Sequence, residues 1–138
     1  MTVTGVPLEY SSPFRKHRIL LVDDSVEFAK IFERVVTRLG HDVRTARDGV
    51  EGAEAALEFR PDVVLLDIGL PGPDGYDVAR RIRDHPWGKG MIIVALTGYG
   101  QVIDERRFHD AGFDAHLAKP VDIEVLVTLI GRSPPSQT

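Results

Sequence analysis

The sequence predicts a doubly wound α/β fold, a three-layer (βα)₅ sandwich around a five-stranded parallel sheet of order 2-1-3-4-5. Short β-branched apolar runs alternate with segments of helical periodicity, and the chain of 138 residues with 43% hydrophobic content has the size of one domain. The strongest apolar runs are continuous rather than alternating, which is typical of strands buried on both faces of a parallel sheet. Right-handed crossovers between such strands then give an open sheet with helices on both faces.

Five strands are expected, of which three are strongly apolar and two are weaker. The strong runs are residues 19–22, 63–66 and 91–96. The weaker runs, residues 42–46 and 115–118, suit the edges of the sheet.

Each strand is followed by a helical segment. The first is expected over residues 26–39, where large apolar residues recur at spacings of three and one and Gly40 follows as the C-terminal stop. Asp48 can cap a second helix that runs to Phe59 and is closed by Arg60 and Pro61. The three remaining helices are expected over residues 76–84, 102–111 and 122–130.

Composition sets the boundaries and excludes several classes of protein. We expect a domain over residues 18–132, a flexible lead-in over 1–17 and a tail over 133–138. The net charge of −4 argues against binding to nucleic acid, which usually requires a basic excess. The sequence has no cysteine, no signal peptide and no apolar run near the roughly 20 residues that a membrane helix needs. These features indicate a cytoplasmic protein that neither spans nor binds a membrane.

Polar residues follow four of the predicted strands, at one edge of the sheet. They are Asp23 and Asp24, Asp67, Thr97, and Lys119 followed by Pro120. Three carboxylates in one crevice repel each other by about 4 kcal/mol per close pair at an effective dielectric constant near 20. Because these loops contain no Cys or His, we expect a hard cation with oxygen ligands, Mg²⁺ or Mn²⁺, to compensate this charge.

The pattern of side chains at this edge is typical of a phosphoryl-transfer site. Asp23 and Asp24 are adjacent and suit the metal, whereas Asp67 ends the central strand and precedes a loop rich in Gly and Pro. We therefore predict that Asp67 is the acceptor, which attacks phosphorus in line to give an acyl phosphate. Lys119 is expected to neutralise the phosphoryl oxygens, and Thr97 is expected to donate a hydrogen bond.

Taken together, these residues carry a family resemblance. The set comprises Asp23-Asp24, Asp67, Leu70-Pro71 with Asp74-Gly75, Thr97-Gly98 and Lys119-Pro120. In order and spacing it resembles the receiver domain of bacterial two-component response regulators, from about Arg18 to Arg132. Residues 95–101 and 111–114 resemble receivers attached to hybrid sensor kinases.

The resemblance implies a flavodoxin-like receiver fold and a signalling function. A histidine kinase or histidine phosphotransfer protein would pass a phosphoryl group from phospho-His to Asp67, with Mg²⁺ present. Self-catalysed phosphotransfer and autodephosphorylation would be the only enzymatic steps. The resemblance also implies that the Gly69 backbone carbonyl joins Asp23, Asp24 and Asp67 as a metal ligand, and that the peptide bond between Lys119 and Pro120 is cis.

Switching in the family couples a threonine, here Thr97, to the residue three before the lysine, here His116. Their movement changes the face formed by the fourth helix, the fifth strand and the fifth helix. A downstream protein target, or a second phosphorylated copy in a homodimer, is expected to bind this face. The sequence shows no DNA-binding output domain, which fits a free-standing receiver or one from a hybrid kinase.

Departures from the family pattern leave alternatives open. His116 stands where Tyr or Phe is usual, and Pro73 replaces a frequent Met, which keeps a phosphorylation-independent pseudo-receiver as one alternative. A small Mg²⁺-dependent phosphohydrolase with an aspartyl nucleophile is another, although the chain has no room for a cap domain. Gly69 and Tyr99 occupy positions that tune phosphoryl lifetime in the family: Gly69 leaves room for water, whereas Tyr99 is in a position to shield the site.

Several basic residues and Trp87 lie outside this set, and we expect them on the surface rather than in the phosphoryl-transfer site. Arg80, Arg81 and Arg83 are expected on an exposed polar helix face. Arg106, Arg107 and His109 are expected, from the resemblance, to form part of a partner surface. Trp87 is expected to cover apolar surface at the opposite edge of the sheet.

Overall fold

A computed structural model describes residues 2–3, 6–7 and 16–131, and its centre is a five-stranded parallel sheet. The strands are β3 Arg18–Val22, β4 Asp42–Ala46, β5 Val63–Asp67, β6 Ile92–Thr97 and β7 Ala115–Ala118. Their order across the sheet is β4-β3-β5-β6-β7, which confirms the predicted 2-1-3-4-5 arrangement.

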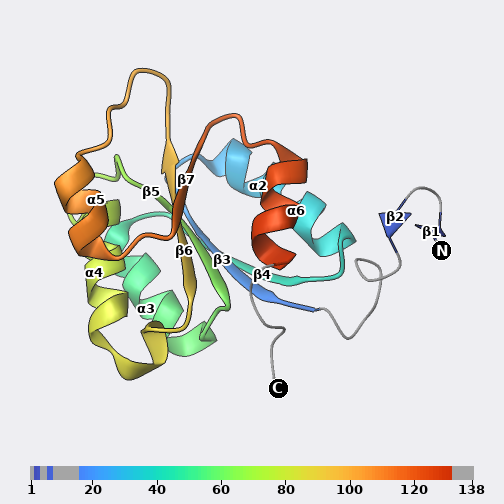
Figure 1. The fold of residues 1–138 in the computed structure, drawn as a ribbon, viewed down its shortest axis with the longest axis horizontal. Coiled ribbons are helices and arrows are strands. Elements are labelled where there is room, and N and C mark those ends of the chain that lie inside the picture. The colour runs from blue at the N-terminus through green and yellow to red at the C-terminus, as the bar shows by residue number, and fades with distance from the viewer. Residues whose placement is uncertain (1, 4–5, 8–15, 132–138) are drawn as a thin grey trace.

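Helices cover both faces of the sheet (Figure 1). Helices α2 Val26–Arg38 and α6 Ile123–Gly131 lie on one face, and α3 Gly49–Phe59, α4 Gly75–Asp84 and α5 Glu105–Ala111 lie on the other. A short 3₁₀ helix, η2 Pro86–Gly88, precedes β6 and places Trp87 partly buried against the core on the α4 side. Within the described residues, no helix is both long enough and apolar enough to cross a bilayer.

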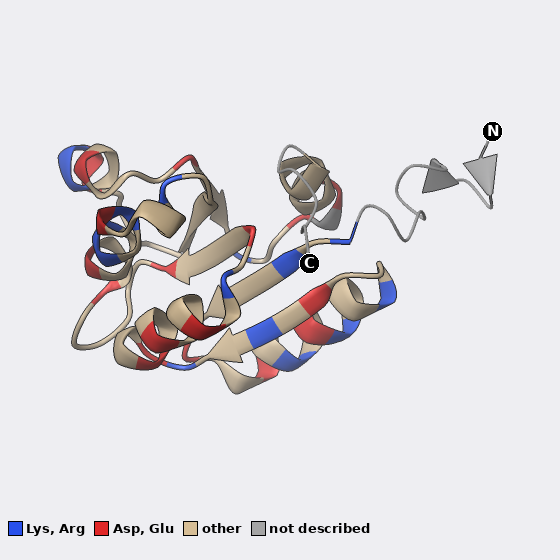
Figure 2. Cartoon of the chain, turned by 90° about the horizontal axis from the view of Figure 1, so that it is seen from below, with Lys and Arg blue, Asp and Glu red and all other residues tan. Residues whose placement is uncertain are grey.

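The central strands are continuous apolar runs because the sheet is covered on both sides. In β3, Ile19 and Leu21 pack toward α2 and α6, whereas Leu20 and Val22 pack toward α3 and α4, and all four are 0% exposed. Burial of each such side chain stabilises the fold by about 1.5–3 kcal/mol. Charged residues of both signs lie on the helices and on the edge strand β4 instead (Figure 2).

Side-chain caps fix where the helices begin. Ser25 caps α2, Asp48 caps α3, and Asp74 caps α4 in a reciprocal capping box with Asp77. Asp104 caps α5 by accepting the backbone N–H of Arg107 at 3.1 Å. All four caps stand at the end of a loop that leaves the carboxyl edge of the sheet, so they hold those loops in place.

Two elements differ from the sequence prediction. Helix α5 begins at Glu105 rather than at residue 102, because the Asp104 cap ends the preceding loop and leaves Val102 88% exposed. In the predicted lead-in, two-residue strands β1 Thr2–Val3 and β2 Val6–Pro7 pair in an antiparallel arrangement. The rest of residues 1–15 and the predicted tail, residues 133–138, lie outside the described residues.

The prediction that Arg83 lies on an exposed polar helix face is wrong. Its side chain is only 18% exposed and donates hydrogen bonds to the backbone carbonyls of Gly88, Met91 and Gly112. It also forms an ion pair with the Asp114 carboxylate at 2.8 Å. One guanidinium therefore joins α4 to η2 and to the segments that enter β6 and β7.

Candidate functional site

Three carboxylates meet at the carboxyl edge of the sheet. Strands β3 and β5 are neighbours in parallel register, with Val22 opposite Leu66, so the residues that follow them come together. One carboxylate oxygen from each of Asp23, Asp24 and Asp67 lies within 4.8 Å of the other two. Asp23 is 1% exposed and Asp67 is 7% exposed, whereas Asp24 faces solvent.

Backbone hydrogen bonds orient the two buried carboxylates. Asp23 Oδ1 accepts the N–H of Ser25 at 2.8 Å, and Asp67 Oδ1 accepts the N–H of Gly69 at 2.8 Å. In both residues the second oxygen, Oδ2, faces the side chain of Lys119.

Lys119 carries the positive charge of the site. Its Nζ forms an ion pair with Asp23 Oδ2 and a second ion pair with Asp67 Oδ2 at 3.2 Å, and it lies 5.3 Å from the centre of the Phe28 ring. Burial by itself lowers the pKa of this ammonium, but the hydrogen bond and charge of Asp23 and the charge of Asp67 outweigh burial and raise the pKa above its ordinary value. Lys119 is therefore cationic, and its peptide bond to Pro120 is cis.

The donor set fits a hard divalent cation. The ammonium of Lys119 offsets only one of the three carboxylate charges. Asp23 Oδ2 is buried, and within the described part of the chain its contact is the ion pair with Lys119 rather than a hydrogen bond of ordinary geometry. All the ligand atoms are carboxylate oxygens, the class that Mg²⁺ and Mn²⁺ prefer over softer nitrogen and sulfur donors.

Thr97 and His116, the two predicted switch residues, line one groove. Thr97 ends β6 and is 7% exposed; its hydroxyl donates to the Leu117 carbonyl at 3.5 Å, a long hydrogen bond. His116 is exposed on β7, and its ring meets that of Phe108 edge to face with centroids 6.0 Å apart.

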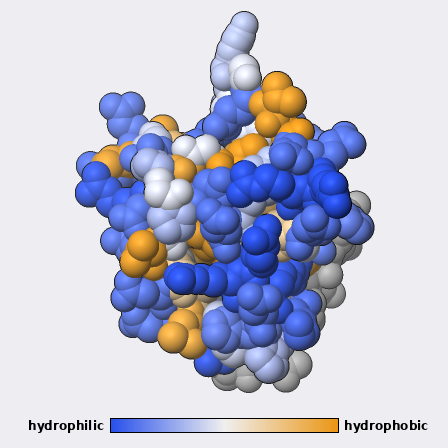
Figure 3. Space-filling model, turned by 90° about the vertical axis from the view of Figure 1, so that its left-hand side faces the viewer, coloured by the Kyte–Doolittle hydropathy of each residue, from blue (hydrophilic) through white to orange (hydrophobic). Residues whose placement is uncertain are grey.

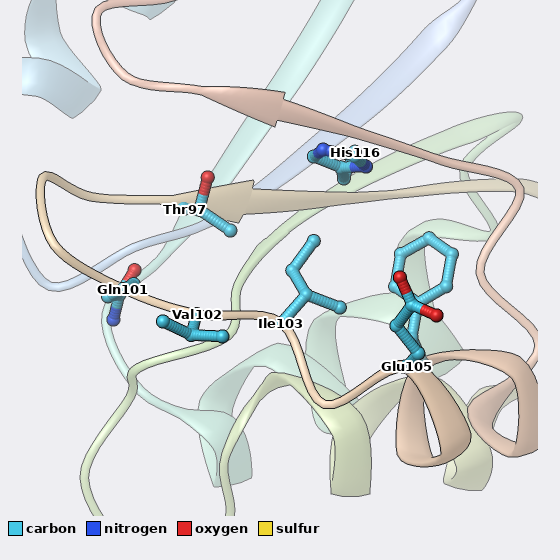
Figure 4. Close-up of a pocket in the computed structure, with 7 residues that line it drawn as sticks. Thr97, Gln101, Val102, Ile103, Glu105 and His116 are labelled. Atoms are coloured by element: carbon cyan, nitrogen blue, oxygen red, sulfur yellow. The ribbon is translucent and has the colours of Figure 1, made fainter.

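The groove has a volume of about 650 Å³ and lies between β7 and α5. Figure 4 shows His116 on the strand side, Glu105 on the helix side, and Val102 and Ile103 between them. The surrounding face over α4 and α5 is mostly hydrophilic, with small hydrophobic patches scattered across it (Figure 3). The two predicted switch positions thus open onto one surface.

Arg107, which is predicted to form part of a partner surface, also makes contacts within the chain. Its guanidinium binds the Asp74 carboxylate at 3.1 Å and lies 4.3 Å from the centre of the Tyr76 ring. The Tyr76 hydroxyl in turn accepts the backbone N–H of Asp104 at 3.0 Å. Arg107 is therefore engaged within the chain, where it ties the start of α4, just after the Asp67 loop, to the start of α5.

The loop after β6 contains a contact that the sequence patterns missed. Tyr99 is 96% exposed and does not cover the cluster in this structure. Instead, the side chain of Gln101 turns back, and its Oε1 accepts the N–H of Gly98. No sequence signal marks Gln101, because its position depends on how two loops meet.

Comparison with known proteins identifies the family. Residues 19–131 match the family model of the response regulator receiver domain. The chain belongs to this family. A curated relative of this receiver domain is the DNA-binding dual master transcriptional regulator RpaA of Synechocystis sp., 33% identical over 113 residues. Those residues are 82% of this chain but 47% of RpaA, so the receiver spans about half the length of that relative.

Solved receiver domains have the same fold. The receiver domain of sensor histidine kinase PA1611 from Pseudomonas aeruginosa, determined with magnesium in its active site cleft, superposes with a TM-score of 0.75 at 32% identity and covers 85% of this chain and 96% of that one. A chain from the complex of the Saccharomyces cerevisiae phosphotransfer protein Ypd1 with the receiver domain of Ssk1 gives a TM-score of 0.76 at 26% identity, with 88% and 90% covered.

Proposed function

We propose that this receiver domain accepts a phosphoryl group on Asp67 from the phospho-His of a histidine kinase or histidine phosphotransfer protein. The observation that carries the proposal is the placement of Asp67. Its carboxylate ends the central strand, accepts a backbone N–H through Oδ1, faces Lys119 through Oδ2 and lies beside two further carboxylates. The same arrangement does not favour a phosphohydrolase, because the described residues form the receiver fold and the short β1–β2 pair and supply no cap domain to enclose a substrate.

In the proposed reaction, an oxygen of Asp67 attacks phosphorus in line. The phosphorus–nitrogen bond to the donor imidazole breaks, its electron pair goes to that nitrogen, and an acyl phosphate forms on Asp67. Lys119 holds positive charge against the phosphoryl oxygens, and the Thr97 hydroxyl exchanges its long bond to Leu117 for one of these oxygens.

Asp23, Asp24 and Asp67, with the Gly69 carbonyl, would hold Mg²⁺ or Mn²⁺. When bound, the cation supplies positive charge against the phosphoryl group. The acidic cluster and the magnesium in the PA1611 receiver support this assignment. We assign no further enzymatic activity beyond phosphotransfer to Asp67 and its self-catalysed loss.

We also propose a switch and two kinds of partner. Phosphorylation would move Thr97 toward the site and His116 with it, changing the face of α5, β7 and α6 for a downstream protein target or for a second copy of the chain. The Ypd1–Ssk1 complex supports a phosphotransfer protein as the donor class. The net charge of −4 supports neither nucleic acid nor an anionic membrane as a partner.

The test is the intact mass of the protein after incubation with Mg²⁺ and acetyl phosphate. We expect one phosphoryl adduct on the wild-type protein and none on Asp67→Ala or in the presence of EDTA. An equal adduct on folded Asp67→Ala contradicts the assignment of Asp67. If folded, Mg²⁺-bound protein takes up no phosphoryl group from acetyl phosphate or from a panel of phosphorylated kinases and phosphotransfer proteins, the chain is a pseudo-receiver instead.

A further inference from the structure

The carboxamide of Gln101 is held in a fixed orientation on the loop between β6 and α5. Its Oε1 accepts the N–H of Gly98, and its own backbone N–H donates to the Gly98 carbonyl at 3.2 Å. These two bonds fold residues 98–101 into a turn. The amide nitrogen, Nε2, is thereby directed away from its own loop and toward the loop that follows β5.

At that second loop, Nε2 lies where a side chain of residue 69 would be. A Cβ built on Gly69 would be 2.0 Å from Gln101 Nε2 and 3.4 Å from Asp67 Oδ1. Gly69 therefore leaves a gap beside the acceptor carboxylate, and Gln101 fills this gap from the neighbouring loop. Tyr99, the other nearby candidate, is 96% exposed and contributes nothing to this contact.

We propose that Gln101 is a positioning residue that sets the lifetime of the phosphoryl group on Asp67. This inference rests on the proposed function. The carboxamide restricts the approach of water on the flank that Gly69 leaves open. In hydrolysis, the water oxygen attacks phosphorus, the bond from phosphorus to the Asp67 oxygen breaks with its electron pair returning to the carboxylate, and a water proton passes to solvent.

Removing the carboxamide is expected to shorten this lifetime. Gln101→Ala should lose the phosphoryl group about fivefold faster than wild type, a change that corresponds to about 1 kcal/mol in the barrier. The measurement is the decay of the intact-mass adduct after acetyl phosphate has been removed. Arg80→Ala, which changes an exposed side chain on α4, serves as the control and should decay at the wild-type rate.

A double-mutant cycle separates positioning from a general structural effect. Gly69 has no positive φ, so alanine fits its backbone, and the methyl group would clash only with the flexible end of Gln101 while lying at ordinary contact distance, 3.4 Å, from Asp67 Oδ1. In wild type, Gly69→Ala displaces the carboxamide and puts a methyl group in its place, so the half-life should not lengthen. In the Gln101→Ala background, the same methyl group enters an open gap and should slow hydrolysis at least about twofold.

Each outcome has one reading. Faster loss from Gln101→Ala, with partial restoration by Gly69→Ala in that background only, supports the role of Gln101. If all variants are labelled on Asp67 and lose the phosphoryl group at the wild-type rate, or if the two substitutions act additively, the role of Gln101 is wrong while the proposed function stands. If wild type and all variants remain unlabelled by acetyl phosphate and by the panel of phosphorylated kinases and phosphotransfer proteins, the proposed function fails and the inference fails with it. Thermal midpoints within about 2 °C of wild type confirm that folding is unchanged.

Discussion

Burial changes the protonation of one histidine far from the acidic cluster. His41 Nδ1 accepts the backbone N–H of His17 at 3.0 Å, and the two rings meet edge to face with centroids 5.3 Å apart. Burial, with a smaller effect of the charge of His17, lowers the pKa of His41 to about 4, and the charge of Asp42 only partly opposes this. The folded protein therefore favours neutral imidazole, which can accept the hydrogen bond.

Stability is consequently expected to fall in acid because of His41. The unfolded chain protonates this ring near its ordinary pKa of 6.5, whereas the folded chain resists protonation down to about pH 4. The unfolded state binds more protons between these values, so the free energy of unfolding decreases as the pH falls from 6.5 to 4. Allowing for solvent screening of a half-buried ring, we expect His41 to account for about 1–2 kcal/mol of this loss.

Urea unfolding at pH 7 and at pH 4.5 measures this effect. His41→Asn keeps an acceptor for the His17 N–H but does not titrate, so its stability should depend less on pH than that of wild type. The difference between the two proteins also removes the contribution of Asp62, whose raised pKa acts in the opposite direction. An equal pH dependence in both proteins would show that His41 is not the group responsible.

Arg83 joins the C-terminal end of helix α4 to the segments near the edge of the sheet opposite the acidic cluster. Arg83 donates to four backbone carbonyls and one carboxylate while its side chain is 18% exposed. Hydrogen bonds from a charged donor contribute about 1.5–3 kcal/mol each, and partners left unpaired add a desolvation cost. We expect Arg83→Ala to lower the free energy of unfolding by about 2–4 kcal/mol, since some of these partners regain water.

Chemical denaturation of Arg83→Ala against Arg80→Ala tests this expectation. Arg80 is exposed on the same helix, so its replacement should stay within about 0.5 kcal/mol of wild type. Arg83→Lys should recover little, because an ammonium cannot reproduce the planar fork that reaches several carbonyls at once. Equal stabilities of Arg83→Ala and Arg80→Ala would contradict the expectation, because Arg83 would then contribute no more to stability than a residue on an exposed polar face.

The elements show which features a single sequence can predict. The strands and most helices follow from apolar periodicity and from caps such as Ser25, Asp48 and Asp74, which act within a few residues. The start of α5 was placed three residues early because the apolar pair Val102 and Ile103 extends the helical pattern past its cap. A local pattern cannot show that a neighbouring cap stops the helix.

The same distinction applies to side chains at the site. Asp23, Asp67 and Thr97 could be located because each lies at or just after the end of a strand, and parallel strands bring their carboxyl ends to one edge. Arg107 and Gln101 could not, because long side chains reach across loops to partners set by tertiary packing. Strand ends are therefore predictable from sequence, whereas cross-loop contacts require the structure.

At the scale of the whole molecule, the sheet concentrates unfavourable charge at the edge where it also places its proposed chemistry. Asp23 and Asp67 share the ammonium of Lys119, Asp24 lies close to both, and close pairs of carboxylates repel each other. The fold is held by the buried strands and helices on both faces, which keep these groups together despite that repulsion. Stability and proposed function therefore oppose each other at Asp67.

This opposition gives a prediction for the whole molecule. Without divalent cations, Asp67→Ala should be more stable than wild type by about 0.5–2 kcal/mol, because relief of repulsion outweighs the loss of one shared ion pair and one backbone hydrogen bond. With Mg²⁺, the difference in stability between the two proteins should become smaller, or wild type should become the more stable of the two. A ligand that binds only the folded state stabilises it in proportion to RT ln(1 + [L]/Kd), and the variant lacks one of the proposed ligands.

The measurement is thermal unfolding of both proteins across a series of Mg²⁺ concentrations, in Ca²⁺-free buffer and with an EDTA reference. It reports both the repulsion between the carboxylates and the stabilisation by bound Mg²⁺. Wild type should gain stability progressively with Mg²⁺, and Asp67→Ala should begin higher and gain less. Arg80→Ala should follow the wild-type curve, because it leaves the acidic cluster intact. Coincident curves for wild type and Asp67→Ala would mean that Asp67 neither binds the cation nor carries the repulsion, and the charge argument for this site would then be wrong.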